Sequence, residues 1–372
     1  MSAGVSRTLL AGLALLESAQ SLAAQRPNDR GAFSTGAEFR SLSFERLPTI
    51  RRLQQSTIPF GAIASYGRLT VDVGSAWAST RIVRTDQTSE SAQHLTDTQV
   101  RGAYTFGRDA VVATLLVNLP TGPRRASALD YGVIGAVSPT FLGFPVAGYA
   151  SGFSVTGGVA GATQVGNWSL GLAGSLRMSS EFTPYVDSTG PIVYKPGVEG
   201  RIRGGADGIV GRSRLTFGLT YSTFGDDQVG ASGSAGKGKY QPGPRWFLEG
   251  GLLAPMGNAT LNISAWNFHR ASGYTAGAAV GNRENLTGAD LAVSIPAGRD
   301  LAIEPVLAGR LSKPQAGEGR MFGVGSRLRV RVSETVALTP LARYDTGSID
   351  DGSGQRSHLH GWYLSALVRL SF

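Results

Sequence analysis

The stretch HLHGWYLSALVRLSF, residues 358–372, ends the chain on an alternating, aromatic-rich segment. Alternate residues of a β-strand point to opposite faces. One face of this segment is continuously apolar and consists of Trp362, Leu364, Ala366, Val368, Leu370 and Phe372. The other face is mixed and carries Arg369. This alternation is typical of a transmembrane β-strand, although a half-buried strand of a soluble sandwich has the same period.

The composition of the 372 residues excludes several classes of protein. Mean hydropathy is −0.02, and beyond the N-terminus no run of 18 apolar residues occurs, which excludes membrane-spanning helices but not a barrel. The absence of cysteine excludes disulfides and Cys-based zinc or iron–sulfur sites. The formal charge of +9 comes mostly from arginines that are scattered singly along alternating segments, so nucleic acid is not an expected partner.

The N-terminus has the pattern of a secretory signal peptide. Arg7 precedes the apolar run 9–16, and Ser21-Leu22-Ala23 fits a small-residue cleavage site. The alternative interpretation is an ordinary N-terminal helix. We therefore expect residues 1–23 to be a signal peptide. Export together with barrel-like alternation, in a chain without cysteine, predicts localisation in a bacterial outer membrane.

Alternating segments recur along the whole chain, joined by connections that are alternately short and long. Short Gly-, Asn- or Asp-containing turns occur near 66–68, 107–109, 166–167, 211–213, 257–258, 298–300 and 333–335. Longer Gly-, Ser-, Asp- or Pro-rich stretches occur at 85–94, 120–151, 183–197, 226–241, 270–284, 313–318 and 347–356. This regularity predicts an up-and-down barrel with short periplasmic turns and long extracellular loops.

The predicted fold is all-β, a transmembrane antiparallel β-barrel of about 16 strands. The strands are expected near 37–46, 55–65, 68–84, 95–106, 110–119, 152–165, 168–182, 198–211, 214–225, 242–256, 258–269, 285–297, 300–312, 319–332, 335–346 and 357–372. Single-chain bacterial barrels have even strand numbers, so 37–46 completes the set. The alternative is 14 strands with an N-terminal plug, and segment 25–54 can supply either a strand or that plug. Residues 24–36 are then a periplasmic N-terminal segment, and 37–372 form the barrel.

The alternation also separates a lipid-facing set from a lumen-facing set. An arginine on the lipid face at mid-bilayer costs about 2–4 kcal/mol, so the charged set must face inward. The expected lumen-lining, solute-selecting residues are Arg101, Arg177, Arg201, Arg203, Glu249, Trp266, Asp290, Glu304, Arg310, Arg327, Arg329, Arg331, Arg343 and Arg369. An excess of arginine in a water-filled lumen favours anionic solutes. The alternative is that these residues only pair across strands and stiffen the wall.

Other motifs carry weaker predictions. Trp77, Trp168, Trp246 and Trp362 are expected on the lipid face as interface anchors. His358 and His360 share one strand face, but that face points to lipid or to the outer rim, so we expect no metal site. GSAGKGKY at 233–240 lacks the Ser or Thr of a phosphate-binding loop, and we expect a basic outer loop that touches lipopolysaccharide. No motif specifies a catalytic site, so we expect neither enzyme activity nor a cofactor.

Two segments resemble a known transporter family. LTDTQVRGAYTFGRD at 95–109 is followed by VVATLLVNLPTG at 111–122, and the chain ends in Phe372. These motifs resemble the outer-membrane transporters grouped with phenol-degradation pathways, which are distant relatives of the long-chain fatty-acid channels. The resemblance implies uptake of hydrophobic or aromatic compounds through a plugged or constricted lumen. The arginine-rich inward set is a departure from that family.

These patterns together predict a porin-like channel for passive or weakly selective uptake of small solutes, whether aromatic or hydrophobic compounds or organic anions. The alternative is a structural or adhesive barrel whose long loops, especially 120–151 and 226–241, bind partners. Expected partners are outer-membrane lipid and lipopolysaccharide, small-molecule solutes, and the barrel-assembly machinery through the C-terminal strand.

Overall fold

A computed structural model describes residues 30–107, 111–123, 126–187, 190–231, 238–281, 283–313, 318–350 and 355–372. The predicted signal peptide lies outside the described residues. Within them, none of the helices combines the length and the hydropathy that a membrane crossing would need.

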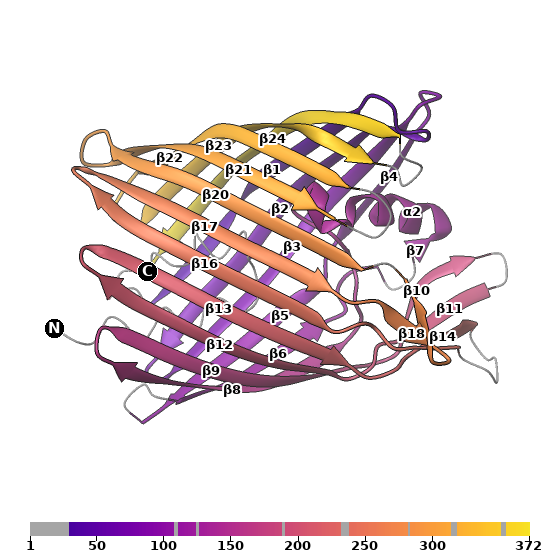
Figure 1. Cartoon of the computed structure of the whole chain (residues 1–372), viewed down its shortest axis with the longest axis horizontal. Helices are drawn as coiled ribbons and strands as arrows, with labels where there is room; N and C mark the ends of the chain where they lie inside the picture. Colours follow the sequence, from indigo (N-terminus) through magenta and orange to yellow (C-terminus); the bar gives the residue numbers. More distant parts are fainter. Residues whose placement is uncertain are drawn as a thin grey trace.

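One closed antiparallel sheet dominates the molecule (Figure 1). Its strands are β1 (Gly31–Phe44), β2 (Ile50–Tyr66), β3 (Leu69–Arg84), β4 (Ser89–Leu95), β5 (Thr98–Phe106), β6 (Val111–Leu119), β8 (Ser154–Val165), β9 (Trp168–Ser179), β12 (Glu199–Val210), β13 (Ser213–Phe224), β16 (Arg245–Met256), β17 (Ala259–Arg270), β20 (Glu284–Pro296), β21 (Leu301–Ser312), β22 (Gly319–Arg331), β23 (Val336–Asp350) and β24 (Arg356–Ser371). Strands β4 and β5 both pair with β3, one after the other, and share one position in the wall. The described residues thus form a barrel of 16 strand positions, as predicted.

The barrel closes where β1 pairs with β24. The N–H of Phe372 donates to the carbonyl of Gly31 at 3.0 Å, and the N–H of Gly31 donates back to the carbonyl of Phe372 at 2.9 Å. The alternation of the last segment is therefore that of a closing strand. The 14-strand alternative is wrong, because residues 31–44 and 50–54 belong to β1 and β2 and do not form a plug.

The two faces of the wall differ as the alternation predicted. Large apolar side chains stand exposed on the outward face, among them Leu172 (66% exposed), Val324 (59%) and Trp362 (51%). The inward face holds the ion pairs described below. An exposed apolar band around a closed barrel is the surface that a transmembrane barrel presents to lipid.

The long connections gather at one end of the barrel, and the C-terminus lies at the other (Figure 1). A second sheet stands at the long-loop end, with strand order β15-β14-β11-β10-β7. Its members are β7 (Ala126–Ser127), β10 (Phe182–Asp187), β11 (Gly190–Lys195), β14 (Asp227–Ala231) and β15 (Gly238–Tyr240), and a small hairpin of β18 (Gly273–Thr275) and β19 (Ala278–Val280) lies beside it. The sequence predicted these stretches as loops, and likewise the stretch 85–94 that contains most of β4.

The connection between β6 and β8 contains the helix α2 (Ala128–Val137) and the 3-10 turn η2 (Thr140–Leu142). Ser127 caps α2, and Asp130 completes a capping box that satisfies backbone N–H groups at the helix start. Along α2, Val133 and Val137 are fully buried. The prediction that 120–151 is an extended outer loop needs correction, because the apolar residues of this connection turn into the barrel.

Candidate functional site

Residues 126–149, called the plug here, pack inside the barrel. Val133, Val137, Phe141, Leu142 and Phe144 form one buried cluster with wall residues. The wall residues of this cluster are Leu42, Phe44, Leu53, Ile82, Ala92, Leu286, Met321 and Leu359, from β1, β2, β3, β4, β20, β22 and β24. From β20 round to β4 these strands span more than half of the wall, and they can meet at one cluster only within the lumen. The plug therefore constricts the lumen near its long-loop end.

Both ends of the plug connection are held by one carboxylate. Asp97 accepts hydrogen bonds from the N–H of Gly122 at 3.1 Å and from the N–H of Ser151 at 2.7 Å. The Asn118 amide donates to Asp97 at 2.9 Å and to the carbonyl of Gly152 at 2.6 Å. Asp97 and Asn118 belong to the two sequence segments that resemble the transporter family. Those motifs have a structural role here, because they fix where the plug leaves and rejoins the wall.

Side chains of the wall also bind the plug backbone. The amide of Gln55 accepts from the N–H of Val146 at 2.9 Å and donates to its carbonyl at 2.8 Å, so it pairs with the plug as a strand neighbour would. On the other side, Arg310 donates to the carbonyl of Thr140 at 3.1 Å. Gly143 has a φ of 62° and lies against the Arg310 guanidinium, where a side chain would clash. Arg310, which the sequence predicted as a lumen-lining residue, thus also holds the plug.

A buried charge cluster lies beside the plug. Arg40 is 1% exposed and contacts Asp345 at 2.9 Å, and Arg343 contacts the same carboxylate at 2.8 Å. The Arg40 guanidinium also lies 5.9 Å from the Phe144 ring of the plug and 5.7 Å from the Tyr363 ring. Of this cluster, only Arg343 was predicted as a site residue. Arg40 and Asp345 were missed, although alternation along β1 and β23 places both on the inward face.

The wall from β8 to β16 lies opposite the cluster that binds the plug. Here Glu199 contacts Arg201 at 2.6 Å and Arg177 at 4.0 Å. Farther round, Glu304 contacts Arg329 at 2.8 Å and Arg327 at 3.3 Å. Glu199, Glu304 and Asp345 thus each face two arginines. At Glu199 and Glu304 this 2:1 arrangement leaves one positive charge on the inner wall.

The remaining predicted site residues are spread along the lumen. Arg101 pairs with Asp72 at 2.6 Å, Arg203 pairs with Glu249, and Arg331 lies 4.0 Å from Asp300. Asp290 and Arg369 occupy inward positions on β20 and β24. Pairing across strands is therefore common, as the stiffening interpretation expected, and it coexists with the arginine excess.

Aromatic side chains join the charges on the inward face of β16 and β17. Phe247 and Trp266 stack with ring centroids 6.2 Å apart and an interplanar angle of 26°. The indole of Trp266 lies against Gly288 of β20, where any side chain would overlap it. Trp266 and Phe268 also pack against the cluster that contains the plug. The lumen beside the plug is therefore amphipathic.

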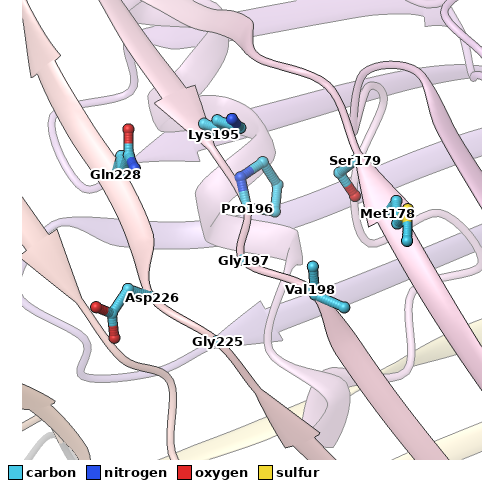
Figure 2. Close-up of a pocket in the computed structure, with 9 residues that line it drawn as sticks. All are labelled: Met178, Ser179, Lys195, Pro196, Gly197, Val198, Gly225, Asp226 and Gln228. Atoms are coloured by element: carbon cyan, nitrogen blue, oxygen red, sulfur yellow. The ribbon is translucent and has the colours of Figure 1, made fainter.

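A separate crevice of about 450 Å³ opens where β9, β12 and β13 meet the outer sheet (Figure 2). Lys195, Asp226 and Gln228 lie on one side of it, and Met178 and Val198 lie on the other. Within the outer sheet, Tyr194 of β11 donates a hydrogen bond to Asp227 of β14. Burial and this carboxylate raise the pKa of Tyr194 well above its usual value.

The fold and the lumen define a β-barrel constricted by an internal loop. No protein-family model and no curated protein matches the sequence. Solved structures similar in fold include a mutant of the TodX monoaromatic hydrocarbon channel (TM-score 0.47, 11% identity, 92% of this chain and 91% of that one). A second is a bacterial polysaccharide outer membrane secretin (TM-score 0.47, 7% identity, 93% of this chain and 100% of that one). A third is an anion-selective porin from Comamonas acidovorans (TM-score 0.40, 10% identity, 92% of this chain and 98% of that one). At these identities the likeness is one of fold alone.

Proposed function

We propose that the protein is a bacterial outer-membrane channel that admits small solutes passively and favours anions. The observation that carries this proposal is the inner wall, where Glu199 and Glu304 are each shared by two arginines. Arginine keeps its charge at every physiological pH. Fixed positive charge on the wall of a narrow aqueous path attracts anions and repels cations.

The exposed apolar band supports the membrane location within this proposal. The predicted signal peptide at 1–23, lipopolysaccharide as an outer-leaflet neighbour, and recognition of the C-terminal strand by the barrel-assembly machinery are further parts of it. Organic anions and aromatic or hydrophobic compounds are the proposed solutes, and the amphipathic lumen supports them. Passage requires no bond making, so the proposal assigns no enzyme activity.

Purified protein in a planar bilayer tests the proposal. A potassium chloride gradient should give a reversal potential of the sign expected for chloride preference. Replacing Arg329, whose side chain is 53% exposed, by glutamate should lower that preference clearly. The matched control is Arg81→Glu, because Arg81 is an exposed residue on the outward face of β3 and its charge is not in the lumen. A folded protein that neither conducts ions nor speeds solute entry into liposomes would refute the channel.

The second candidate is an adhesive barrel, and the outer sheet favours it. Strand β15 is the edge of that sheet, and an edge strand offers unpaired backbone groups to a partner. The 120–151 connection, which was the other predicted binding loop, turns inward. Deleting 226–241 should abolish partner binding and leave conductance unchanged if adhesion is the function.

A further inference from the structure

Arg245 differs from the other inward arginines described above. It stands at the long-loop end of β16, where the register pairs it with Ser222 and Arg270. Within the described part of the chain its guanidinium makes neither a hydrogen bond nor an ion pair, and its Nε is buried without a partner. Its one close partner is the Phe224 ring, 4.6 Å from the guanidinium carbon. A cation held against an aromatic ring, with its donors unused, is ready to bind an anion.

The charges around Arg245 add to its positive field. Arg201 and Arg270 are near enough to repel the Arg245 charge, and Glu199 is near enough to attract it. Glu199 already contacts Arg201 and Arg177, and Arg270 contacts Glu284 at 3.2 Å. Both of these carboxylates, Glu199 and Glu284, are therefore already engaged by other arginines. An incoming carboxylate would relieve this repulsion as well as fill the unused donors.

The next inward residue along β16 is Phe247, which stacks on Trp266. Residues two apart on one strand face are separated by about 7 Å. The inward face of β16 therefore presents a free guanidinium and, about 7 Å deeper, an aromatic pair that borders the plug cluster. Deeper in the lumen than this pair, Arg203 is paired with Glu249. The guanidinium without such a pair, that of Arg245, therefore lies on the long-loop side of the rings.

We propose that Arg245, Phe247 and Trp266 form an entry subsite for carboxylates that carry an aromatic ring on a short linker. The carboxylate binds the Arg245 guanidinium, and the ring contacts Phe247 and Trp266 at the edge of the plug. This inference rests on the proposed channel function and gives its solute class. A small inorganic anion would use the guanidinium but not the rings, and a neutral aromatic alcohol would use the rings but not the guanidinium.

The test is block of the chloride current through the full-length protein in a planar bilayer. We expect 3-phenylpropionate to block the wild-type channel at lower concentration than 3-phenylpropan-1-ol or inorganic phosphate. Arg245→Gln should raise the half-blocking concentration of 3-phenylpropionate at least tenfold, since charge-assisted hydrogen bonds are lost. Trp266→Leu should raise it a few-fold and should leave phosphate block unchanged.

Arg214→Gln is the matched control, because it removes the same charge from the lumen at the short-turn end of β13, where Arg214 is about one-third exposed and lies 2.9 Å from Asp207. This control should change the half-blocking concentration of 3-phenylpropionate less than twofold. Arg245→Lys, which keeps the positive charge, should be blocked at a lower concentration than Arg245→Gln. Equal block of the wild type and Arg245→Gln, or block by phosphate as strong as by 3-phenylpropionate, would overturn the subsite. Loss of the chloride current in the wild type would instead refute the channel function itself.

Discussion

The half of the lumen wall that the plug covers, from β20 round to β4, differs sharply from the half that it leaves open, from β8 to β16. In the covered half, wall side chains are apolar or bind the plug backbone, as Gln55 does at Val146. The charged side chains that lie beside the plug are excluded from water, since Arg40 is 1% and Asp345 is 2% exposed. In the open half, Arg177 and Arg201 are about one-third exposed.

The difference shows how one barrel uses arginine in two ways. Removed from water, a charge is tolerated only when opposite charges and hydrogen bonds compensate it, so Arg40 serves as a fixed anchor beside the plug. Near water, an ion pair contributes little to stability, so Arg177 and Arg201 act through their field on passing solutes. The position of the plug decides which role each arginine has.

The largest effect should come from removing the plug, which creates the difference between the two halves of the wall. Replacing the plug, residues 126–149, by a short Gly-Ser linker should raise single-channel conductance several-fold, because the lumen loses its constriction. Anion preference should fall at the same time, since ions then pass farther from the charged wall. Single-channel recording in a planar bilayer measures both. Unchanged conductance in a folded variant would mean that the plug does not limit the path.

Much of the fold was readable from the sequence because alternation has a period of two and repeats along every barrel strand. The inward set followed from the same pattern, including Trp266 and the arginines that share Glu199 and Glu304. Phe247 was not predicted as a site residue, because its role depends on stacking with Trp266 of the neighbouring strand. Pairing partners depend on strand register, which alternation leaves undetermined.

The plug was not predicted, although its sequence held a signal. The connection 120–151 contains the apolar stretch 133–137 and the segment 140–146, and such residues are unfavourable in an exposed loop. The Gly and Pro residues within it indicated a loop. No local sequence pattern distinguishes a loop that folds into the lumen from one that points outward. The contacts of Asp97 and Gln55 that fix it are long-range, from strands distant in sequence.

A second prediction compares one substitution in both environments. Asp345→Asn should lower the free energy of unfolding by about 3–5 kcal/mol, because it removes the carboxylate charge that lies 2.9 Å from buried Arg40. Glu249→Gln, the same carboxylate-to-amide change at the partly exposed pair with Arg203 in the open half, should lower it by about 1 kcal/mol or less. Urea unfolding in detergent micelles, followed by tryptophan fluorescence, gives both values. Similar values for the two variants would remove the distinction between the covered and the open half.

The smallest predicted effect concerns the outer sheet at the long-loop end. The raised pKa of Tyr194 means that its hydrogen bond to Asp227 is fully present below the usual tyrosine pKa of 10.0 and is lost only as the pH rises through the raised value. Tyr194→Phe should therefore destabilise the sheet by about 1 kcal/mol at neutral pH, by the loss of one hydrogen bond. Hydrogen exchange should show faster exchange of the amides of β11 and β14 and unchanged exchange in β22. Burial raises the pKa of Tyr149 as well, so in the wild type absorbance at alkaline pH should show a late step of tyrosine ionisation, and Tyr194→Phe should lower its amplitude. If the amplitude is the same in the variant, Tyr194 does not ionise late and the contact with Asp227 does not hold the sheet.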